Sequence, residues 1–364
     1  MRRLWLAGLV FLLTCHRAHD DPKPPPPAAT AREPLRGAAG DADLRVMLAE
    51  IASAKACKLI EGQFRPLRAP DRHEVVTGTL WIRTCDITND GTHVVFHLSG
   101  NGWQWVDQTK HQAGGKFVVR EYVRFGVSIE MPGALDIAYD RSSHIVSLWF
   151  SPDRMPDIKF TPLGKIDVDR DGAWSSILGA VSSIFASSPE HQAHDQATHQ
   201  GTEQFAYELA DGMAVTIDLC TGLSRFNLGR PVKGAMQFAD AGETRAVPVE
   251  LQPRGVLMFG PQLAPNGMTV QVDARDGAVR IGIACQDQAN ELADAWLAGN
   301  LGEVPYLAMA DVYAHGRVHI PPQKCPVVVV ARSLEQPVLF DWQRPASEIA
   351  GSTGGPIIHC AKHK

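Results

Sequence analysis

The sequence predicts an α+β fold, in which a long-stranded antiparallel sheet covered by helices is followed by a mostly-β, sandwich-like domain. Three observations lead to this prediction. Apolar and polar residues alternate over unusually long stretches, two segments carry apolar stripes at helical spacing, and short apolar runs recur at even intervals near the C-terminus. Because strands with one apolar face need a covering layer, we expect the two helical segments to pack on the long strands.

Residues 1–14 have the features of a lipoprotein signal peptide. Two arginines precede about ten apolar residues, too few for a membrane-spanning helix of roughly 20. Leu12 lies three positions before Cys15, as at sites of lipid modification, although Leu13 and Thr14 are larger than the residues usual there. A conventional secretory signal is the alternative and would also export the chain. We therefore expect a lipid on Cys15, and a periplasmic or outer-membrane lipoprotein in the cell envelope of a Gram-negative bacterium.

Residues 15–40 are predicted to form a proline-rich tether. They include Pro22, the run Pro24–Pro27 and many small residues, with few apolar side chains to bury. Proline-rich chains favour the extended polyproline II conformation and act as semi-rigid spacers. Such a segment would hold a folded body away from the membrane, to which a multiply acylated N-terminus would anchor it stably.

The cysteines indicate an oxidising compartment. Of the 7 cysteines, six remain when Cys15 carries a lipid, and an even set favours three disulfides. Six cysteines allow 15 pairings, among which sequence alone does not choose. Buried free thiols are the alternative, and no Cys-x-x-Cys spacing supports a zinc or thioredoxin-type site. The pairs that we expect are Cys57 with Cys85, Cys285 with Cys325, and Cys220 with Cys360.

Residues 41–235 are predicted to form the helix-covered sheet. Asp41–Phe64 carries an apolar stripe at helical spacing, in which Lys55 is out of place, and a second stripe runs over residues 174–185. Between them the period changes to two. The clearest run, Phe117–Met131, predicts a strand of about fifteen residues where five or six are typical.

Turn signals divide the alternating segments. They lie at Asn89, Pro132 and Asp140, so that neighbouring strands should pair antiparallel, and the alternation resumes over residues 158–168. Trp103 and Trp105 lie just beyond a glycine-rich loop within this region. We interpret them as core residues, with the rim of a ligand-binding mouth or a membrane contact as the alternatives.

Residues 236–345 are predicted to form the sandwich-like domain. Seven short apolar runs alternate with turn residues between Val247 and Trp342. The tail, residues 346–364, shows no readable pattern. One helix is expected in this domain, and the residues on its inner side are Ala289, Leu292, Ala293 and Trp296.

The order of helix, long strands, second helix and return strand over residues 41–229 resembles the tubular lipid-binding fold of the bactericidal/permeability-increasing type. Glu121, on the apolar face of the longest strand, departs from that pattern. The resemblance implies an apolar groove for acyl chains between strands and helices. The side chains that would face such a ligand are Phe117, Val119, Val123, Phe125, Val127, Ile129, Trp174, Ile177, Val181 and Phe185.

One short segment suggests a metal. Asp167, Asp169 and Asp171, followed by a glycine, match the first half of a calcium-binding loop. The twelfth position should be a bidentate glutamate, but it is Leu178, and no helix is predicted before the loop. Acidic residues on the outer side of a strand, next to a helix N-terminus, are the alternative. We therefore expect no cofactor, with calcium at these aspartates as the alternative.

The sequence contains no catalytic constellation, and we favour a non-enzymatic role. A net charge of −5 leaves no basic face for nucleic acid. Two hypotheses remain: a membrane-anchored envelope lipoprotein that binds a lipid or other apolar ligand between sheet and helices, or an envelope scaffold or complex subunit that binds another protein through its β domains. A third, a metal-assisted hydrolase, would rest on the aspartates and on His191, His194 and His199.

Overall fold

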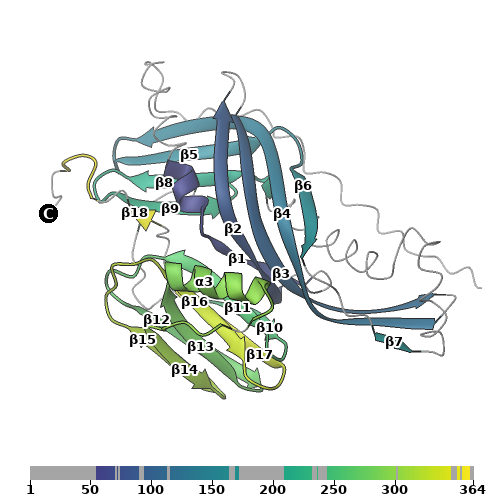
Figure 1. The fold of residues 1–364 in the computed structure, drawn as a ribbon. Helices are drawn as coiled ribbons and strands as arrows, with labels where there is room; N and C mark the ends of the chain where they lie inside the picture. Colours follow the sequence, from purple (N-terminus) through teal and green to yellow (C-terminus); the bar gives the residue numbers. More distant parts are fainter. Residues whose placement is uncertain are drawn as a thin grey trace, which may run out of the picture. The chain divides into compact units, whose positions relative to one another are not determined.

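The computed structural model describes residues 55–69, 72, 74–89, 94–112, 115–163, 169–171, 209–231, 236, 244–300, 302–345, 351–352 and 355–360. Strands dominate these residues (Figure 1), and helix within them is confined to residues 55–60, residues 209–210 and α3 (Gln286–Leu297). The predicted α+β class is therefore wrong. The protein is mostly β, built on a large antiparallel sheet, and helices do not cover that sheet in the described part of the chain.

The N-terminal part of the described chain forms a continuous series of antiparallel strands. Strands β1 to β5 pair in sequence, β5 then pairs with β8, and β8 pairs with β9. The long strand β4 also pairs with β6 and β7, on different parts of its length from β5. A short strand, β18 (Gly351–Ser352), adds to β9. The strands are β1 (Phe64–Arg68), β2 (Val76–Asn89), β3 (Val94–Gln112), β4 (Gly115–Asp140), β5 (Ile145–Pro152), β6 (Asp157–Leu163), β7 (Asp169–Asp171), β8 (Met213–Asp218) and β9 (Leu223–Leu228).

The strand predicted over residues 117–131 is confirmed and is longer than expected. β4 has 26 residues and continues through Pro132, so the turn predicted there is wrong. Pro132 pairs with Val95 and Gly133 with Val94, and a Cβ at Gly133 would lie 2.7 Å from the Phe150 ring. The glycine therefore lets an aromatic ring pack directly on the strand, where the sequence pattern suggested a chain reversal.

The turn predicted at Asp140 is confirmed. β4 ends there, and the Asp140 carboxylate accepts hydrogen bonds from the backbone N–H and hydroxyl of Ser142 and from the hydroxyl of Ser143. These hydroxyls, followed by the backbone donors, lower the pKa of Asp140 to about 2. The local hydrogen bonds are those of an Asx turn, which closes the β4–β5 hairpin.

Within the described residues, the apolar side of this sheet is packed mainly with side chains of its own strands. One buried cluster joins residues of β2, β3, β4, β5, β8 and β9 with Ala56, Ile60 and Leu209. The helix predicted over Asp41–Phe64 is observed over residues 55–60, on the concave side of the sheet (purple in Figure 1). It ends before Gly62, whose φ of +77° redirects the chain into β1. Residues 41–54 and the predicted helix over residues 174–185 lie outside the described residues.

The C-terminal strands form two sheets around a second buried cluster. In one sheet the order is β14, β13, β16, β11, and in the other it is β15, β12, β17, β10. Their bounds are β10 (Thr244–Leu251), β11 (Val256–Gln262), β12 (Met268–Asp276), β13 (Val279–Cys285), β14 (Ala308–Val312), β15 (His315–Ile320), β16 (Val327–Ser333) and β17 (Val338–Pro345).

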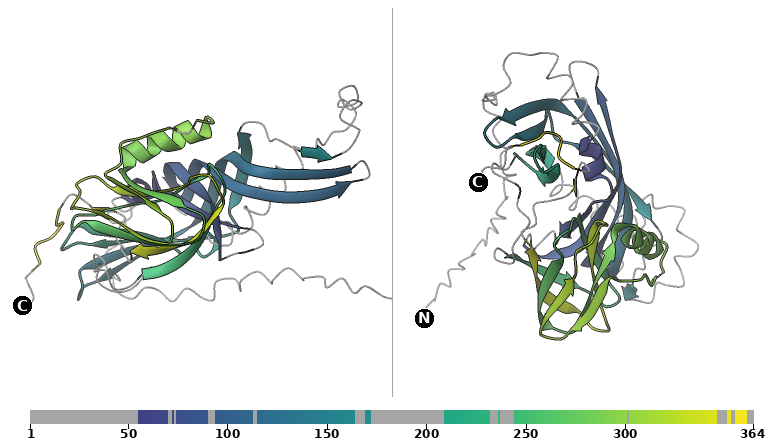
Figure 2. Two further views of the ribbon diagram at one scale, coloured as in Figure 1. Left: turned by 90° about the horizontal axis from the view of Figure 1, so that it is seen from below. Right: turned by 90° about the vertical axis from the view of Figure 1, so that its left-hand side faces the viewer.

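A third cluster connects the two sets of strands. The inner side of α3 is as predicted, with Ala289, Leu292, Ala293 and Trp296 buried. These residues pack with Val256, Met258, Val328 and Val330 on one side and with Phe64, Trp81 and Trp103 on the other. Figure 2 shows α3 lying across one face of the sheet that contains β11, β13 and β16. All described residues belong to one compact unit.

Trp103 is a core residue, as interpreted from the sequence. Its side chain is fully buried, and its Nε1 donates a hydrogen bond to the Val256 carbonyl at 2.5 Å. Trp105 is half-buried, and its ring contacts Tyr122 edge-on. Trp103 therefore fixes β3 to β11. Trp105 is connected to Trp103 through a series of ring contacts that includes Tyr122 and Trp296.

Three disulfides connect the cysteines in the expected pairs. Their Cα–Cα distances are 5.1, 5.4 and 5.7 Å, within the range of natural disulfides. The pairs are Cys57–Cys85, Cys220–Cys360 and Cys285–Cys325. None of the described helices is long and apolar enough to cross a membrane.

Candidate functional site

A cleft of about 280 Å³ opens where the helical turn of residues 55–60 and β9 meet the loop after β11 and the start of α3. One part of its lining is apolar, and the other carries amine, amide and hydroxyl groups. The apolar residues are Leu59, Ile217, Pro261, Leu263 and Pro326. The polar residues are Lys55, Lys58, Glu61, Gln63, Ser224, Gln286, Lys324 and Ser352.

Two disulfides hold the basic segments of this cleft. Cys57 lies between Lys55 and Lys58 and is bonded to Cys85 of β2. Lys324 precedes Cys325, which is bonded to Cys285 next to the first residue of α3. The backbone next to each lysine is thus fixed covalently to a strand.

The charges around the cleft are mostly positive. Three lysines and one glutamate line it, which leaves a formal charge of +2 in a chain of net charge −5. Lys58 and Lys324 are exposed and Lys55 is half-buried. Within the described chain, none of the three ammonium groups has an ion-pair partner. The Glu61 carboxylate accepts the backbone N–H of Cys85 at 3.1 Å.

The neutral polar groups have different surroundings. Gln63 is buried, and its amide donates to the Leu59 carbonyl at 2.9 Å, so it supports the helical turn. The Ser224 hydroxyl has no hydrogen-bond partner among the described residues, although only 2% of this residue is exposed. The Gln286 amide packs directly against Gly62, where a Cβ would collide with it. Ser224 and Gln286 can therefore donate hydrogen bonds to a molecule in the cleft.

The residues predicted to face an apolar ligand do not line this cleft. Val123, Phe125, Val127 and Ile129 are buried, and the last three belong to the core cluster of the first sheet. Phe117 and Val119 have their backbone in β4, and their side chains lie outside the description. The remaining candidates, which lie outside the described residues, are Trp174, Ile177, Val181 and Phe185.

The lipidation and calcium predictions also fall largely outside the description. Cys15 and Asp167 lie outside the described residues, as do His191, His194 and His199. Asp169 and Asp171 lie in β7, where their backbones pair with Val118 and Lys116 of β4, but their side chains are not described. Both predictions therefore stay predictions.

One group of possible metal ligands occurs elsewhere in the described chain. Ligand atoms of His144, Cys220 and Cys360 lie within 4.8 Å of one another. The two cysteines are bonded to each other, and His144 Nδ1 shares a hydrogen bond of 3.0 Å with the Tyr139 hydroxyl. Because disulfide sulfurs are not thiolates, this group is not a metal site in the oxidised protein.

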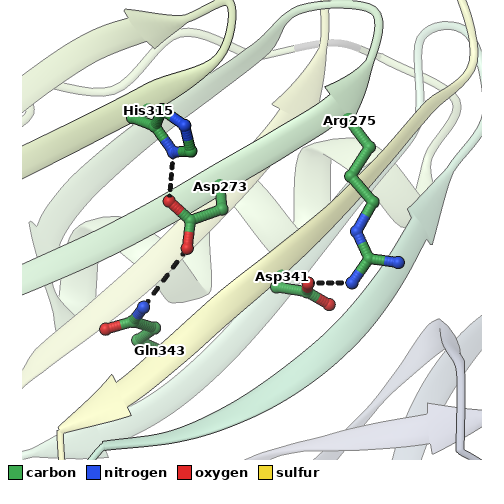
Figure 3. A network of polar contacts seen from close by, with 5 residues as sticks. All are labelled: Asp273, Arg275, His315, Asp341 and Gln343. Carbon is green, nitrogen blue, oxygen red and sulfur yellow. Dashed lines mark hydrogen bonds and ion pairs between the residues drawn. The ribbon is translucent and has the colours of Figure 1, made fainter.

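A polar network lies on the outer face of β12, β15 and β17 (Figure 3). His315 Nδ1 contacts the Asp273 carboxylate at 2.6 Å, the Gln343 amide donates to the same carboxylate at 3.2 Å, and Arg275 pairs with Asp341. The His315 hydrogen bond is the main cause that lowers the pKa of Asp273. His315 is highly exposed, so water screens this group. The contacts of this network are cross-strand pairs, which stabilise the face of the sheet.

The cleft was not predicted from the sequence. One signal was available, because Lys55 interrupts the apolar stripe of the first helix, and this charge lines the cleft. The other residues come from segments far apart in the chain, which only the fold brings together.

The sequence matches no protein-family model and no characterised protein. Among solved structures, it is similar to a multidomain structure of extended synaptotagmin 2 that includes the SMP domain, with 10% identity over 82% of this chain and a TM-score of 0.18. Because 61% of that structure is matched, the chain spans about three fifths of its length. Two variants of Bacillus subtilis oxalate decarboxylase OxdC match 74% of this chain and 77% of theirs, with 10% and 9% identity and TM-scores of 0.15 and 0.14.

These likenesses carry no functional argument, because TM-scores this low do not establish a shared fold. The resemblance noted in the sequence therefore stays a prediction, and the function is argued from the cleft.

Proposed function

We propose that this chain is an extracytoplasmic binding protein, tethered to a cell-envelope membrane through Cys15, that holds a small amphipathic ligand in the cleft. The observation that carries the proposal is the composition of the cleft lining, which combines apolar residues with lysine, glutamine and serine side chains. Binding sites of proteins are typically concave and apolar, with a few placed polar groups. The three disulfides support a location outside the cytoplasm.

The size of the cleft limits the ligand. Pockets for small organic ligands measure roughly 300–1,000 Å³, and a cleft of about 280 Å³ lies at the lower end of this range. It suits a headgroup or a small organic molecule, with any longer apolar chain extending beyond the cleft. A ligand buried within the first sheet would have to displace the packed side chains of its core cluster.

A cleft-filling variant tests this proposal. Native mass spectrometry of the gently purified full chain should reveal a bound small molecule, and Leu263→Trp should abolish it because the indole occupies the cleft. Leu307→Trp is the matched control, since Leu307 is exposed and does not line the cleft. A ligand-free wild-type protein, or a ligand that survives in the Leu263 variant, would contradict the proposal.

One observation favours a second candidate function, that of an envelope scaffold. β14 pairs with β13 and with no other strand in the described chain, and Leu307, Met309 and Tyr313 are exposed on it or beside it. An edge strand with apolar side chains can add a strand of another protein. Met309→Lys should then prevent chemical cross-linking to an envelope protein in intact cells, while Leu263→Trp should leave it unchanged.

A further inference from the structure

The lysines of the cleft form an uncompensated positive site. Lys55, Lys58 and Lys324 line one cavity, and the single carboxylate among its described lining residues, Glu61, already accepts a backbone N–H. Like charges around one cavity repel one another, and the repulsion grows as the surroundings become less polar. Since no described carboxylate pairs with these ammonium groups, an anionic ligand would relieve this repulsion.

Two neutral donors lie in the same cleft. The Ser224 hydroxyl lines the cleft and has no protein partner in the described chain, so it is available to donate a hydrogen bond to a ligand. Gln286 is the first residue of α3, a helix of 12 residues. The N-terminal end of this helix therefore contributes partial positive charge to the cleft lining. Both features favour an acceptor-rich anion.

We infer that the ligand carries a phosphate group, held by Lys55, Lys58 and Lys324 with hydrogen bonds from Ser224 and Gln286. This inference rests on the proposed binding function and names the chemical class of its ligand. Lysine ammonium groups bind phosphate as point charges. A phosphate also offers more acceptor oxygens than a carboxylate, which suits a cleft with three lysines and two further hydrogen-bond donors.

The phosphate has two plausible sources, a free phosphate ester and the headgroup of a phospholipid. The apolar residues Leu59 and Leu263 lie in the same cleft as the lysines. They can contact the glycerol and the first methylenes of a lipid, while the free ester would use only the polar wall. The shared chemistry is the phosphate, and binding measurements on both classes separate the sources.

Isothermal titration calorimetry on the full chain at low ionic strength tests the inference. The probes are glycerol 3-phosphate, dihexanoyl phosphatidic acid, and the uncharged dihexanoylglycerol. The Lys58→Gln, Lys324→Gln double variant removes two exposed charges that stabilise no described contact, so its fold should be unaffected. Lys159→Gln, which changes a lysine of β6 outside the cleft, is the matched control.

The expected result is binding of at least one phosphate probe, weakened about tenfold or more by the double variant and unchanged by Lys159→Gln. Equal binding of both phosphates indicates a free ester, and stronger binding of phosphatidic acid indicates a lipid headgroup. Binding of dihexanoylglycerol as tight as that of phosphatidic acid, with no effect of the double variant, overturns the inference but leaves the proposed function standing. No binding of any probe also overturns the inference, whereas the proposed function is decided by the native mass spectra of the wild type and the Leu263→Trp variant.

Discussion

At the scale of single residues, Tyr122 shows how one hydroxyl joins distant parts of the chain. Its oxygen accepts the backbone N–H of Gln252 at 3.1 Å, and its ring contacts Trp105 and Trp296 edge-on. Burial raises the pKa of this phenol well above its usual value, although the Gln252 hydrogen bond acts in the opposite direction. The folded protein therefore keeps Tyr122 protonated at pH values where an unfolded chain would lose the proton.

Tyr122→Phe should lower the free energy of unfolding by about 1–3 kcal/mol at neutral pH, because the Gln252 N–H loses its acceptor. The pH dependence should change as well. A raised pKa in the folded state gives stability that is complete below the unfolded value of about 10 and is lost as the pH rises further. Urea denaturation between pH 8 and 11 should show a smaller loss in the variant than in the wild type. An equal loss of stability with pH in the variant and in the wild type would contradict this explanation.

At the scale of elements, Trp103 holds β3 against β11. The side chain is fully buried, and its indole N–H reaches the Val256 carbonyl. The ring also contacts Trp296 of α3 edge-on. One side chain of β3 therefore contacts both a strand and a helix of the C-terminal part, within the cluster that the two parts share.

Trp103→Phe should destabilise the protein by about 2–4 kcal/mol, since it removes a buried hydrogen bond and leaves a cavity. Trp105→Phe is the matched control, because Trp105 is half-buried and has no described hydrogen bond. Thermal and urea unfolding of both variants measure the difference. An equal loss in the two variants would show that the hydrogen bond to Val256 contributes little.

The strands could be predicted from the sequence better than the residues that pack on their apolar face. The alternation over residues 117–131 and the short apolar runs after residue 244 correspond to observed strands, because period-two patterns depend on local burial. The helical cover was wrong for a non-local reason. Side chains of neighbouring strands fill much of the space beside the sheet, as where the Phe150 ring packs over Gly133 and contacts Phe96.

At the scale of the whole molecule, the three disulfides close loops of different length. The sequence separations are 28 for Cys57–Cys85, 40 for Cys285–Cys325 and 140 for Cys220–Cys360. In the chain-entropy model, longer closed loops restrict the unfolded chain more.

Replacing each pair with serines should therefore lower the free energy of unfolding by about 3.5, 4 and 5 kcal/mol, respectively. Urea denaturation of the three double variants, under non-reducing conditions, tests the order. The largest loss in the Cys57, Cys85 variant would show that local packing of the cleft outweighs chain entropy.

The tethering prediction is also a property of the whole molecule. If Cys15 carries a lipid, the wild-type chain expressed in an export-competent bacterium should enter the detergent phase on phase partitioning, and Cys15→Ser should remain in the aqueous phase. Mass spectrometry of the N-terminal peptide should show the acyl mass in the wild type alone. Identical partitioning of both chains would remove the membrane anchor from the proposal.

The cleft illustrates why the site was harder to predict than the strands. Lys55 could be noticed as a charge within an apolar stripe, but Ser224 and Lys324 lie in a strand and a loop more than a hundred residues away. Nothing in their local sequence distinguishes these residues from ordinary surface and strand residues. Their common position depends on the long-range pairing of strands and on the disulfides that frame the cleft.

Strand β16 has a consequence for how the chain finds its pairing. Val327 and Val329 face one core and Val328 and Val330 the other, so a shift by one residue would exchange four identical side chains at no cost in polarity. The four valines therefore do not select the native alignment of this strand, which depends on the residues that flank them. Cys285 aligns with Val327 across the ladder, and its disulfide to Cys325 lies just before it. Once oxidised, that bond holds β16 next to the start of α3 in this register, so we expect formation of the Cys285–Cys325 disulfide to limit misalignment of β16.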